Sequence, residues 1–340
     1  MESFGNILIL HAGAIGDTLL ATPVSAALKL NYPGAHITYW THPMLKDILL
    51  GLCPSIDEVI DYNRDASVFD LAKTFSQFRP DLFIDLTNSN KSKLMTLFSG
   101  VKTLRYVKQD ANARPIRHAA ENFLDTVRPI CPEIPDNLFP TIFPDAVADA
   151  VLDRILEEHD MLSYPLIGIV AGVGRIRPHR AWVFECWTYL LEHIFGLKKY
   201  LPVLVGGNDE VDLAKALNDS VDGKCLNLVG RLSLSETAAI LKRCKVIVSG
   251  DTGPAHMSVA VGARVIGLYG PTFPERSGPF GCMDLVLDQS DKCECHDVKV
   301  CRFTNPGDPG QCMSRIMLAE VIDKLDGELG LKESGNESGY

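Results

Sequence analysis

Residues 249–256 combine the residue types that bind a phosphate group, in the order Ser-Gly-Asp-Thr-Gly-Pro-Ala-His. Two glycines and an Asp-Thr pair lie just before an expected helix, where free backbone N–H groups attract an anion. His256 falls about one turn into that helix, so its side chain points back toward the same loop. A lone histidine is more often a satisfied core residue, but its place after this loop favours a role in binding.

Two further loops carry charge next to glycine. Residues 171–182 contain three arginines and one histidine beside two glycines, in the order Ala-Gly-Val-Gly-Arg-Ile-Arg-Pro-His-Arg-Ala-Trp. Guanidinium groups suit a diphosphate leaving group, whose departing charge must be neutralised; a solvated surface loop is the alternative. Residues 206–210, Gly-Gly-Asn-Asp-Glu, place a carboxylate where it can accept hydrogen bonds from a ribose or a base.

Asp17 follows the first apolar run of the chain and a glycine, Gly16. The start of a helix keeps a carboxylate ionised, as a general base must be. The alternative is an ordinary helix-capping aspartate. A dinucleotide site is disfavoured, because Gly13-x-x-Gly16 lacks the G-x-G-x-x-G spacing.

The elements that must position these loops alternate between short apolar strands and helices, one of them expected from Asp17 to Leu30. This alternation predicts two parallel α/β sheets, one on each side of the proline-rich segment 129–144. We expect domains at 1–150 and 151–325 and a disordered tail at 326–340. Ligands of parallel sheets bind at the carboxyl ends of the strands, so the loops are expected to face one another across a cleft. The expected strands are 6–10, 35–40, 58–62, 82–86, 103–107, 166–171, 202–205, 246–249 and 264–269.

The composition narrows the function further. The 340-residue chain has a net charge of −10, which disfavours nucleic acid as a partner. It contains no run near the roughly 18 apolar residues of a membrane helix and no signal-peptide pattern, so we expect a cytoplasmic protein. Of its ten cysteines, the five that are scattered along the chain are expected to be buried thiols: Cys53, Cys131, Cys186, Cys225 and Cys244. Four of the others lack the paired C-x2-C spacing of common zinc sites and predict a structural loop, with metal ligation left open: Cys293, Cys295, Cys301 and Cys312.

Two distant motifs resemble those of the ADP-heptose:lipopolysaccharide heptosyltransferases, glycosyltransferase family 9. The first is the strand, Gly16-Asp17 and helix leading to Pro23, and the second is D-[ST]-G-x-x-H at 251–256, followed by Gly-Leu-Tyr-Gly-Pro-Thr at 267–272. The similarity extends from Asn6 to about Leu325. This resemblance implies a GT-B fold of two Rossmann-like domains, with a lipid-linked anionic saccharide acceptor on the first and ADP-heptose on the second.

The resemblance also implies inverting transfer without a metal or cofactor, with Asp17 as the general base. The implied donor-binding residues are Arg180, Glu210, Asp251, Thr252, Gly253 and His256. Arg180 stands where the family usually has lysine, and His11 where it often has arginine or lysine.

The acceptor side is expected in the basic segment 102–117, through Lys102, Arg105 and Arg117. Such a segment also suits peripheral contact with the inner membrane, or a solvated basic face. Alternatives to the heptosyltransferase are a relative using another nucleotide sugar, an epimerase of similar fold, and a non-catalytic or redox-sensing protein.

Overall fold

The computed structural model describes residues 3–110, 113–134, 140–159, 161–295, 301–305 and 307–331. The chain forms two compact units, Met1–Asp145 (unit 1) and Ala146–Tyr340 (unit 2). The expected boundary at 150 would fall inside helix α7 (Ala146–Glu158), which packs on α10 (Leu234–Arg243) of unit 2. Each unit is described by itself below.

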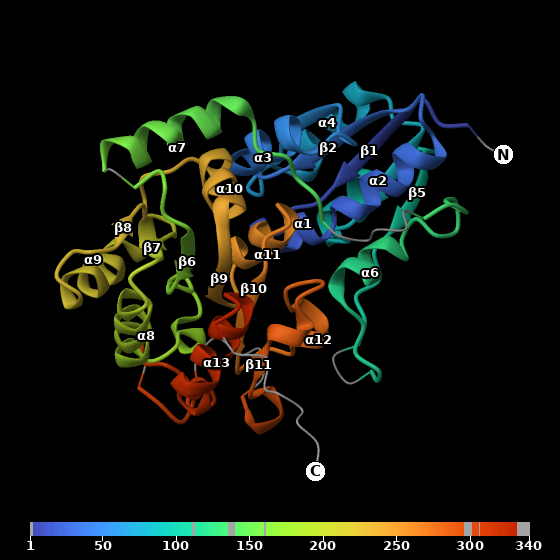
Figure 1. The fold of residues 1–340 in the computed structure, drawn as a ribbon. Helices are drawn as coiled ribbons and strands as arrows, with labels where there is room; N and C mark the ends of the chain where they lie inside the picture. Colours follow the sequence, from blue (N-terminus) through green and yellow to red (C-terminus); the bar gives the residue numbers. More distant parts are fainter. Residues whose placement is uncertain are drawn as a thin grey trace, which may run out of the picture. The chain divides into compact units, whose positions relative to one another are not determined.

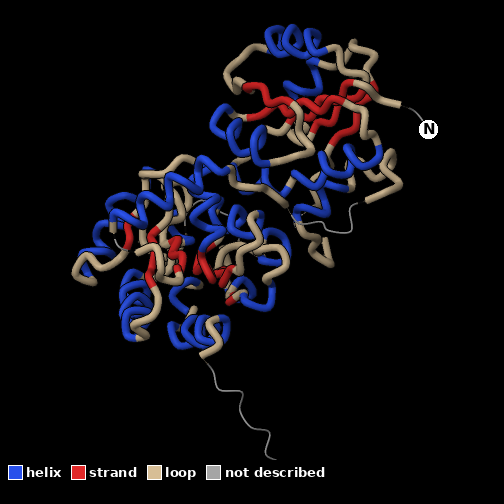
Figure 2. The backbone as a smooth tube through the Cα atoms, turned by 45° about the horizontal axis from the view of Figure 1, so that its top comes forward, coloured by secondary structure: helices blue, strands red, loops and turns tan. Residues whose placement is uncertain are grey.

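Unit 1 is built on a parallel five-stranded sheet in the order β3-β2-β1-β4-β5; β1, β2 and β5 are labelled in Figure 1. In the central strand, Ile7 is in register with Ile37 on one side and Leu82 on the other. Because helices cover both faces of the sheet (Figure 2), the central strands are continuous apolar runs and are almost fully buried. The strands are β1 (Asn6–Leu10), β2 (His36–Thr41), β3 (Glu58–Asp61), β4 (Leu82–Asp85) and β5 (Lys102–Arg105).

The helix expected from Asp17 to Leu30 is two helices in the structure. α1 (Ile15–Leu20) ends at Ala21, and α2 (Thr22–Asn31) begins with Pro23 in its first turn. Proline has no N–H to continue the hydrogen-bond ladder, so it ends one helix and starts the next. The other helices of unit 1 are α3 (Lys46–Leu52), α4 (Val68–Phe78), α5 (Asn90–Met95) and α6 (Ala119–Leu124).

Unit 2 contains a parallel six-stranded sheet in the order β11-β10-β9-β6-β7-β8. Strands β8 and β11 were not expected, since two residues are too few to show a periodicity. A capping box begins α10 (Leu234–Arg243): the Ser233 hydroxyl accepts from the Glu236 N–H, and the Glu236 carboxylate accepts from the Ser233 N–H. The strands are β6 (Leu166–Val170), β7 (Leu201–Leu204), β8 (Leu226–Asn227), β9 (Cys244–Gly250), β10 (Val265–Tyr269) and β11 (Leu287–Asp288).

The helices of unit 2 enclose its sheet. None of the described helices in either unit has the length and apolar character needed to cross a bilayer. The tail expected at 326–340 starts too early, because α13 buries Leu325 and continues to Glu328; residues 332–340 lie outside the described part. Besides α7 and α10, the helices are α8 (Phe184–Gly196), α9 (Val211–Ser220), α11 (Gly253–Ala260), α12 (Pro274–Ser277) and α13 (Leu318–Glu328).

Candidate active site

The strand order of unit 2 predicts a ligand site at the carboxyl ends of β6 and β9. From β6 the chain proceeds outward to β7 and β8, and then returns to the other side of β6 with β9, β10 and β11. Open parallel sheets bind ligands at the carboxyl ends of the strands where the order reverses. The loops after β6 and β9 are the ones for which the sequence predicted donor binding.

Arg180 and Asp251 meet at this position. Arg180 ends the short 3-10 helix Pro178–Arg180, and its Nη1 lies 2.8 Å from Oδ2 of Asp251. Burial by itself raises the pKa of Asp251, but the neighbouring His256 and the charge of Arg180 outweigh burial and hold that pKa below its usual value. The carboxylate is therefore ionised at neutral pH, although its side chain is only 10% exposed.

The three residues after Asp251 form the start of α11. Thr252 is the N-cap, and its hydroxyl accepts from the Ala255 N–H; Gly253 is the first helical residue. His256 is 5% exposed and directs Nε2 toward Asp251 Oδ1 at 3.8 Å. Among the described residues its Nδ1, which is buried, has no hydrogen-bond partner. The structure thus brings Arg180, Asp251 and His256 together.

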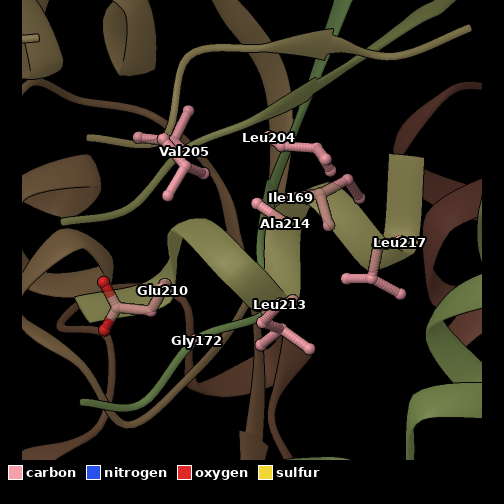
Figure 3. Close-up of a pocket in the computed structure, with 10 residues that line it drawn as sticks. Ile169, Gly172, Leu204, Val205, Glu210, Leu213, Ala214 and Leu217 are labelled. Atoms are coloured by element: carbon pink, nitrogen blue, oxygen red, sulfur yellow. The ribbon is translucent and has the colours of Figure 1, made fainter. Parts of the chain in front are cut away.

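Glu210 connects two loops at the same edge of the sheet. Its Oε1 accepts from the Gly174 N–H at 3.0 Å and its Oε2 from the Gly207 N–H at 2.7 Å. Figure 3 shows Glu210 beside the loop that carries Gly172. Only glycine fits there, because an added Cβ on Gly172 would lie 1.9 Å from Cγ of Glu210. The side chain expected to meet a ribose therefore also fixes the shape of its own pocket.

A pocket of about 290 Å³ adjoins Glu210 and contains residues that the sequence analysis did not identify. Trp182 and Trp187 line it with their rings edge to face, 5.1 Å apart, and Phe184 lies on the same wall. Trp182 is fixed by donating its indole N–H to the Ile316 carbonyl at 3.0 Å. Aromatic walls beside one carboxylate suit a flat, polar-edged ring.

Asp17 occupies the corresponding edge of unit 1. It is the third residue of α1 and is exposed, whereas the N-cap is Ala14, so the capping alternative is wrong. Within the described ranges, no hydrogen bond or ion pair engages the Asp17 carboxylate. β1 lies beside β4, at the point where the strand order of unit 1 reverses. The loops that follow these two strands are joined by a hydrogen bond, in which the Ala12 N–H donates to the Thr87 hydroxyl at 2.9 Å.

His11 is buried beside Asp17. Its ring meets Phe123 edge to face, with centroids 5.2 Å apart, and only glycine at 13 leaves room for it. Burial lowers the pKa of His11 to about 4, and the charge of Asp17 opposes this shift only in part. His11 is therefore neutral at pH 7, unlike the cationic residue that the family often has there.

The basic residues expected to bind the acceptor are used within unit 1. Arg105 pairs with the buried Asp85, and Arg117 pairs with Asp125 and with Glu121. The ammonium group of Lys102 lies over the ring of Phe4, 5.4 Å from its centroid. The carboxylates paired with Arg105 and Arg117 reduce the positive charge that the segment 102–117 presents to a ligand.

All ten cysteines are free thiols, and nine of them are buried. The Cys312 thiol is hydrogen-bonded with that of Cys293, and the Cys301 thiol with that of Cys295. Across the described part of the chain, no three His, Cys, Asp or Glu side chains are grouped as a metal site.

Two parallel α/β domains with polar residues at the carboxyl ends of their strands define the GT-B class of glycosyltransferase, and solved structures agree. The family 9 glycosyltransferase of Veillonella parvula matches with a TM-score of 0.79 at 20% identity, covering 97% of this chain and 98% of that one. The ADP-heptose LPS heptosyltransferase II of Escherichia coli matches with a TM-score of 0.75 at 20% identity, covering 96% and 99%. The predicted fold class is confirmed.

Comparison of the sequence with known families shows which family the chain belongs to. Residues 68–305 match glycosyltransferase family 9 (heptosyltransferase), and the chain belongs to this family and is an enzyme. The lipooligosaccharide heptosyltransferase 2 of Haemophilus influenzae is 25% identical over 299 residues, covering 81% of this chain and 86% of that protein.

Proposed function

We propose that this enzyme transfers a heptose from ADP-heptose to the inner core of lipopolysaccharide, onto a Kdo or heptose acceptor. Membership of the heptosyltransferase family and the names of its relatives support the donor and the acceptor. The observation that carries the chemistry is the exposed carboxylate of Asp17, which makes no hydrogen bond or ion pair with any described group.

In the proposed step, Asp17 accepts the proton of the acceptor hydroxyl as that oxygen attacks the anomeric carbon. The new C–O bond forms on the face opposite the departing ADP, so the configuration inverts. The bond from the anomeric carbon to the β-phosphate oxygen breaks, and ADP takes that electron pair. Negative charge thus develops on the diphosphate, where a fixed cation stabilises it most.

Unit 2 supplies the proposed donor site. Arg180 and the start of α11, with Thr252 and Gly253, would meet the diphosphate, and His256 would offer Nδ1 to a phosphate or sugar oxygen. Asp251 would hold Arg180 in place and meet the sugar. Glu210 would accept from the ribose, with the base in the pocket beside Trp182. No metal or cofactor is part of this proposal.

The acceptor side rests on unit 1. Lys102, Arg105 and Arg117 remain the proposed contacts to an anionic, lipid-linked saccharide, although Arg105 and Arg117 already pair with carboxylates. Ten unpaired thiols fit a reducing compartment. We therefore place the enzyme in the cytoplasm, in peripheral contact with the inner membrane.

The test separates chemistry from donor binding. Asp17→Asn removes the proton acceptor without changing the shape of the site, so the transfer rate should fall by roughly 10²–10⁴-fold. Calorimetric affinity for ADP-heptose should stay within about twofold, since Asp17 lies in the other unit. Asp47→Asn is the matched control, because Asp47 is also an exposed acid in the first turn of a unit 1 helix.

Full transfer by the Asp17→Asn variant would refute the base assignment. Calorimetry with ADP-glucose and UDP-sugars alongside ADP-heptose tests the donor. Selective binding of one of those sugars would remove the heptose assignment and leave the role of Asp17 open to the same variant.

A further inference from the structure

Helix α5 of unit 1 ends in three apolar side chains that the protein does not cover. Leu94, Leu97 and Phe98 are 57%, 63% and 94% exposed. Leu97 donates its N–H to the Leu94 carbonyl, so the helical turn continues past Met95. Residues three and four apart lie on one face of a helix, and these three side chains therefore form one surface. We name them the α5 tip.

The opposite side of the same turn is anchored in the core. Met95 is buried with Leu71 and Phe75 of α4, and Thr96 donates its hydroxyl to the Ser92 carbonyl. The helix is therefore fixed in its orientation, and the α5 tip is held outward. α4 packs beside α5 and presents another exposed aromatic residue, Phe69, at 78% exposure.

The charge around the α5 tip is opposite to that of the whole chain. Residues 86–109 contain five Lys or Arg and no Asp or Glu, in a protein with a net charge of −10. Lys93 is exposed immediately before Leu94. Even with Arg105 offset by Asp85, the segment is positive. Apolar side chains flanked by lysine match the boundary between anionic headgroups and acyl chains.

The loop that starts α5 also touches the loop that carries the proposed base. Thr87, between β4 and α5, accepts the Ala12 N–H at 2.9 Å, and Asn88 donates to the Tyr106 carbonyl at 2.8 Å. The second bond holds the strand end that carries Val107, 75% exposed, and Lys108. Val107 and Lys108 thus lie at the edge of the sheet where Asp17 lies. The α5 tip lies toward the other edge, because Lys102, four residues after Phe98, begins β5 in register with the first residue of β4, Leu82.

We propose that the α5 tip, with Lys93, inserts into the interface of an anionic bilayer and holds unit 1 against it. The inference rests on the proposed transfer to a lipid-linked acceptor and names the surface that meets the lipid. Apolar insertion and lysine attraction act together, so binding requires both the side chains and the anionic headgroups.

The experiment uses the full chain and vesicles of phosphatidylcholine with or without phosphatidylglycerol. Co-sedimentation should show binding to the anionic vesicles, weaker binding at high salt, and little binding to the neutral vesicles. The double variant Leu97→Ser/Phe98→Ser should bind at least roughly tenfold more weakly, since it loses the apolar surface that becomes buried. Lys93→Glu should also weaken binding, and only to anionic vesicles.

Tyr189→Ser is the matched control, because Tyr189 is a 55% exposed aromatic residue on α8 of unit 2. It should bind vesicles like the unchanged protein. All these side chains are exposed, so the thermal midpoints should agree and a folding defect would be seen directly. Undiminished vesicle binding by the double variant would overturn the proposal. The proposal would also be overturned if the unchanged chain formed a dimer, and the double variant dissociated that dimer while binding vesicles equally well.

Transfer to a delipidated acceptor in solution keeps the two proposals apart. The α5 tip variants should retain that activity and lose transfer to the acceptor embedded in vesicles. If no transfer occurs to either acceptor while the double variant still loses vesicle binding, the proposed function fails and the membrane surface stands.

Discussion

Replacing Gly172 by alanine should damage unit 2 through one side chain, Glu210. The added Cβ would lie 1.9 Å from Cγ of Glu210 and 2.9 Å from its Cβ and Cδ. Carbon atoms in contact are normally about 3.5–4.0 Å apart. The conflict reaches Cβ, next to the backbone, so a rotation of the carboxylate end cannot relieve it. Glu210 must leave its position and give up the Gly174 and Gly207 N–H groups.

The expected loss in the free energy of unfolding follows from those two hydrogen bonds and from the steric overlap. A hydrogen bond to a charged group stabilises by about 1.5–3 kcal/mol. Because Glu210 is half-buried, we take the low end for each, and overpacking adds about 1 kcal/mol. The free energy of unfolding should therefore fall by about 4 kcal/mol, which lowers the thermal midpoint of a unit of this size by roughly 10 °C. Binding of ADP-heptose should weaken at least roughly tenfold, since the carboxylate leaves the pocket.

Differential scanning calorimetry measures the first effect and isothermal titration the second. Gly196→Ala is the control, because nothing lies within 4 Å of a Cβ added at that helix end; it should leave stability unchanged or raise it by about 0.5 kcal/mol. The decisive variant is Gly172→Ala/Glu210→Ala, which lacks the atoms nearest the new Cβ. On the Glu210→Ala background, Gly172→Ala should cost only about 1 kcal/mol. An equal loss on both backgrounds would show that the backbone at Gly172, rather than Glu210, is responsible.

Two further predictions concern the charged groups. Arg180→Met should destabilise unit 2 by about 3–5 kcal/mol in denaturant unfolding, because it leaves Asp251 buried without its cation; Arg180→Lys should cost less, and equal losses would contradict the ion pair. Stability should fall as the pH drops from about 6.5 toward about 4, where the unfolded chain protonates His11 and the folded chain does not. His11→Phe should flatten that slope in urea titrations, and an unchanged slope would assign it to other groups.

The place of the proposed donor residues in the fold could be predicted, because most of them are close together in the sequence. Asp251, Thr252, Gly253 and His256 lie within six consecutive residues, directly after a buried strand. In a parallel sheet the end of a strand fixes where such a loop lies. Arg180 is distant in the sequence, yet it also follows a strand, β6, and the strand order brings β6 beside β9.

The features that could not be predicted depend on partners distant in the sequence or on very short elements. The ion pair of Arg105 with Asp85 forms only when β4 and β5 align in register. Nothing in the order of residues 102–117 distinguishes a guanidinium group available to a ligand from one paired across the sheet. The pocket wall at Trp187 was missed for a related reason, since its helical spacing is the same whether it faces core or ligand.

The three carboxylates of the proposed mechanism differ in how many hydrogen bonds they already make, and this difference agrees with their roles. Glu210 accepts two backbone N–H groups and Asp251 holds a guanidinium, so both are fixed before any ligand arrives. A fixed carboxylate is suited to orient a donor, because binding costs it little rearrangement. A general base must instead keep a lone pair for the incoming hydroxyl. Asp17, exposed and without such contacts among the described residues, is the carboxylate of the three that meets this requirement.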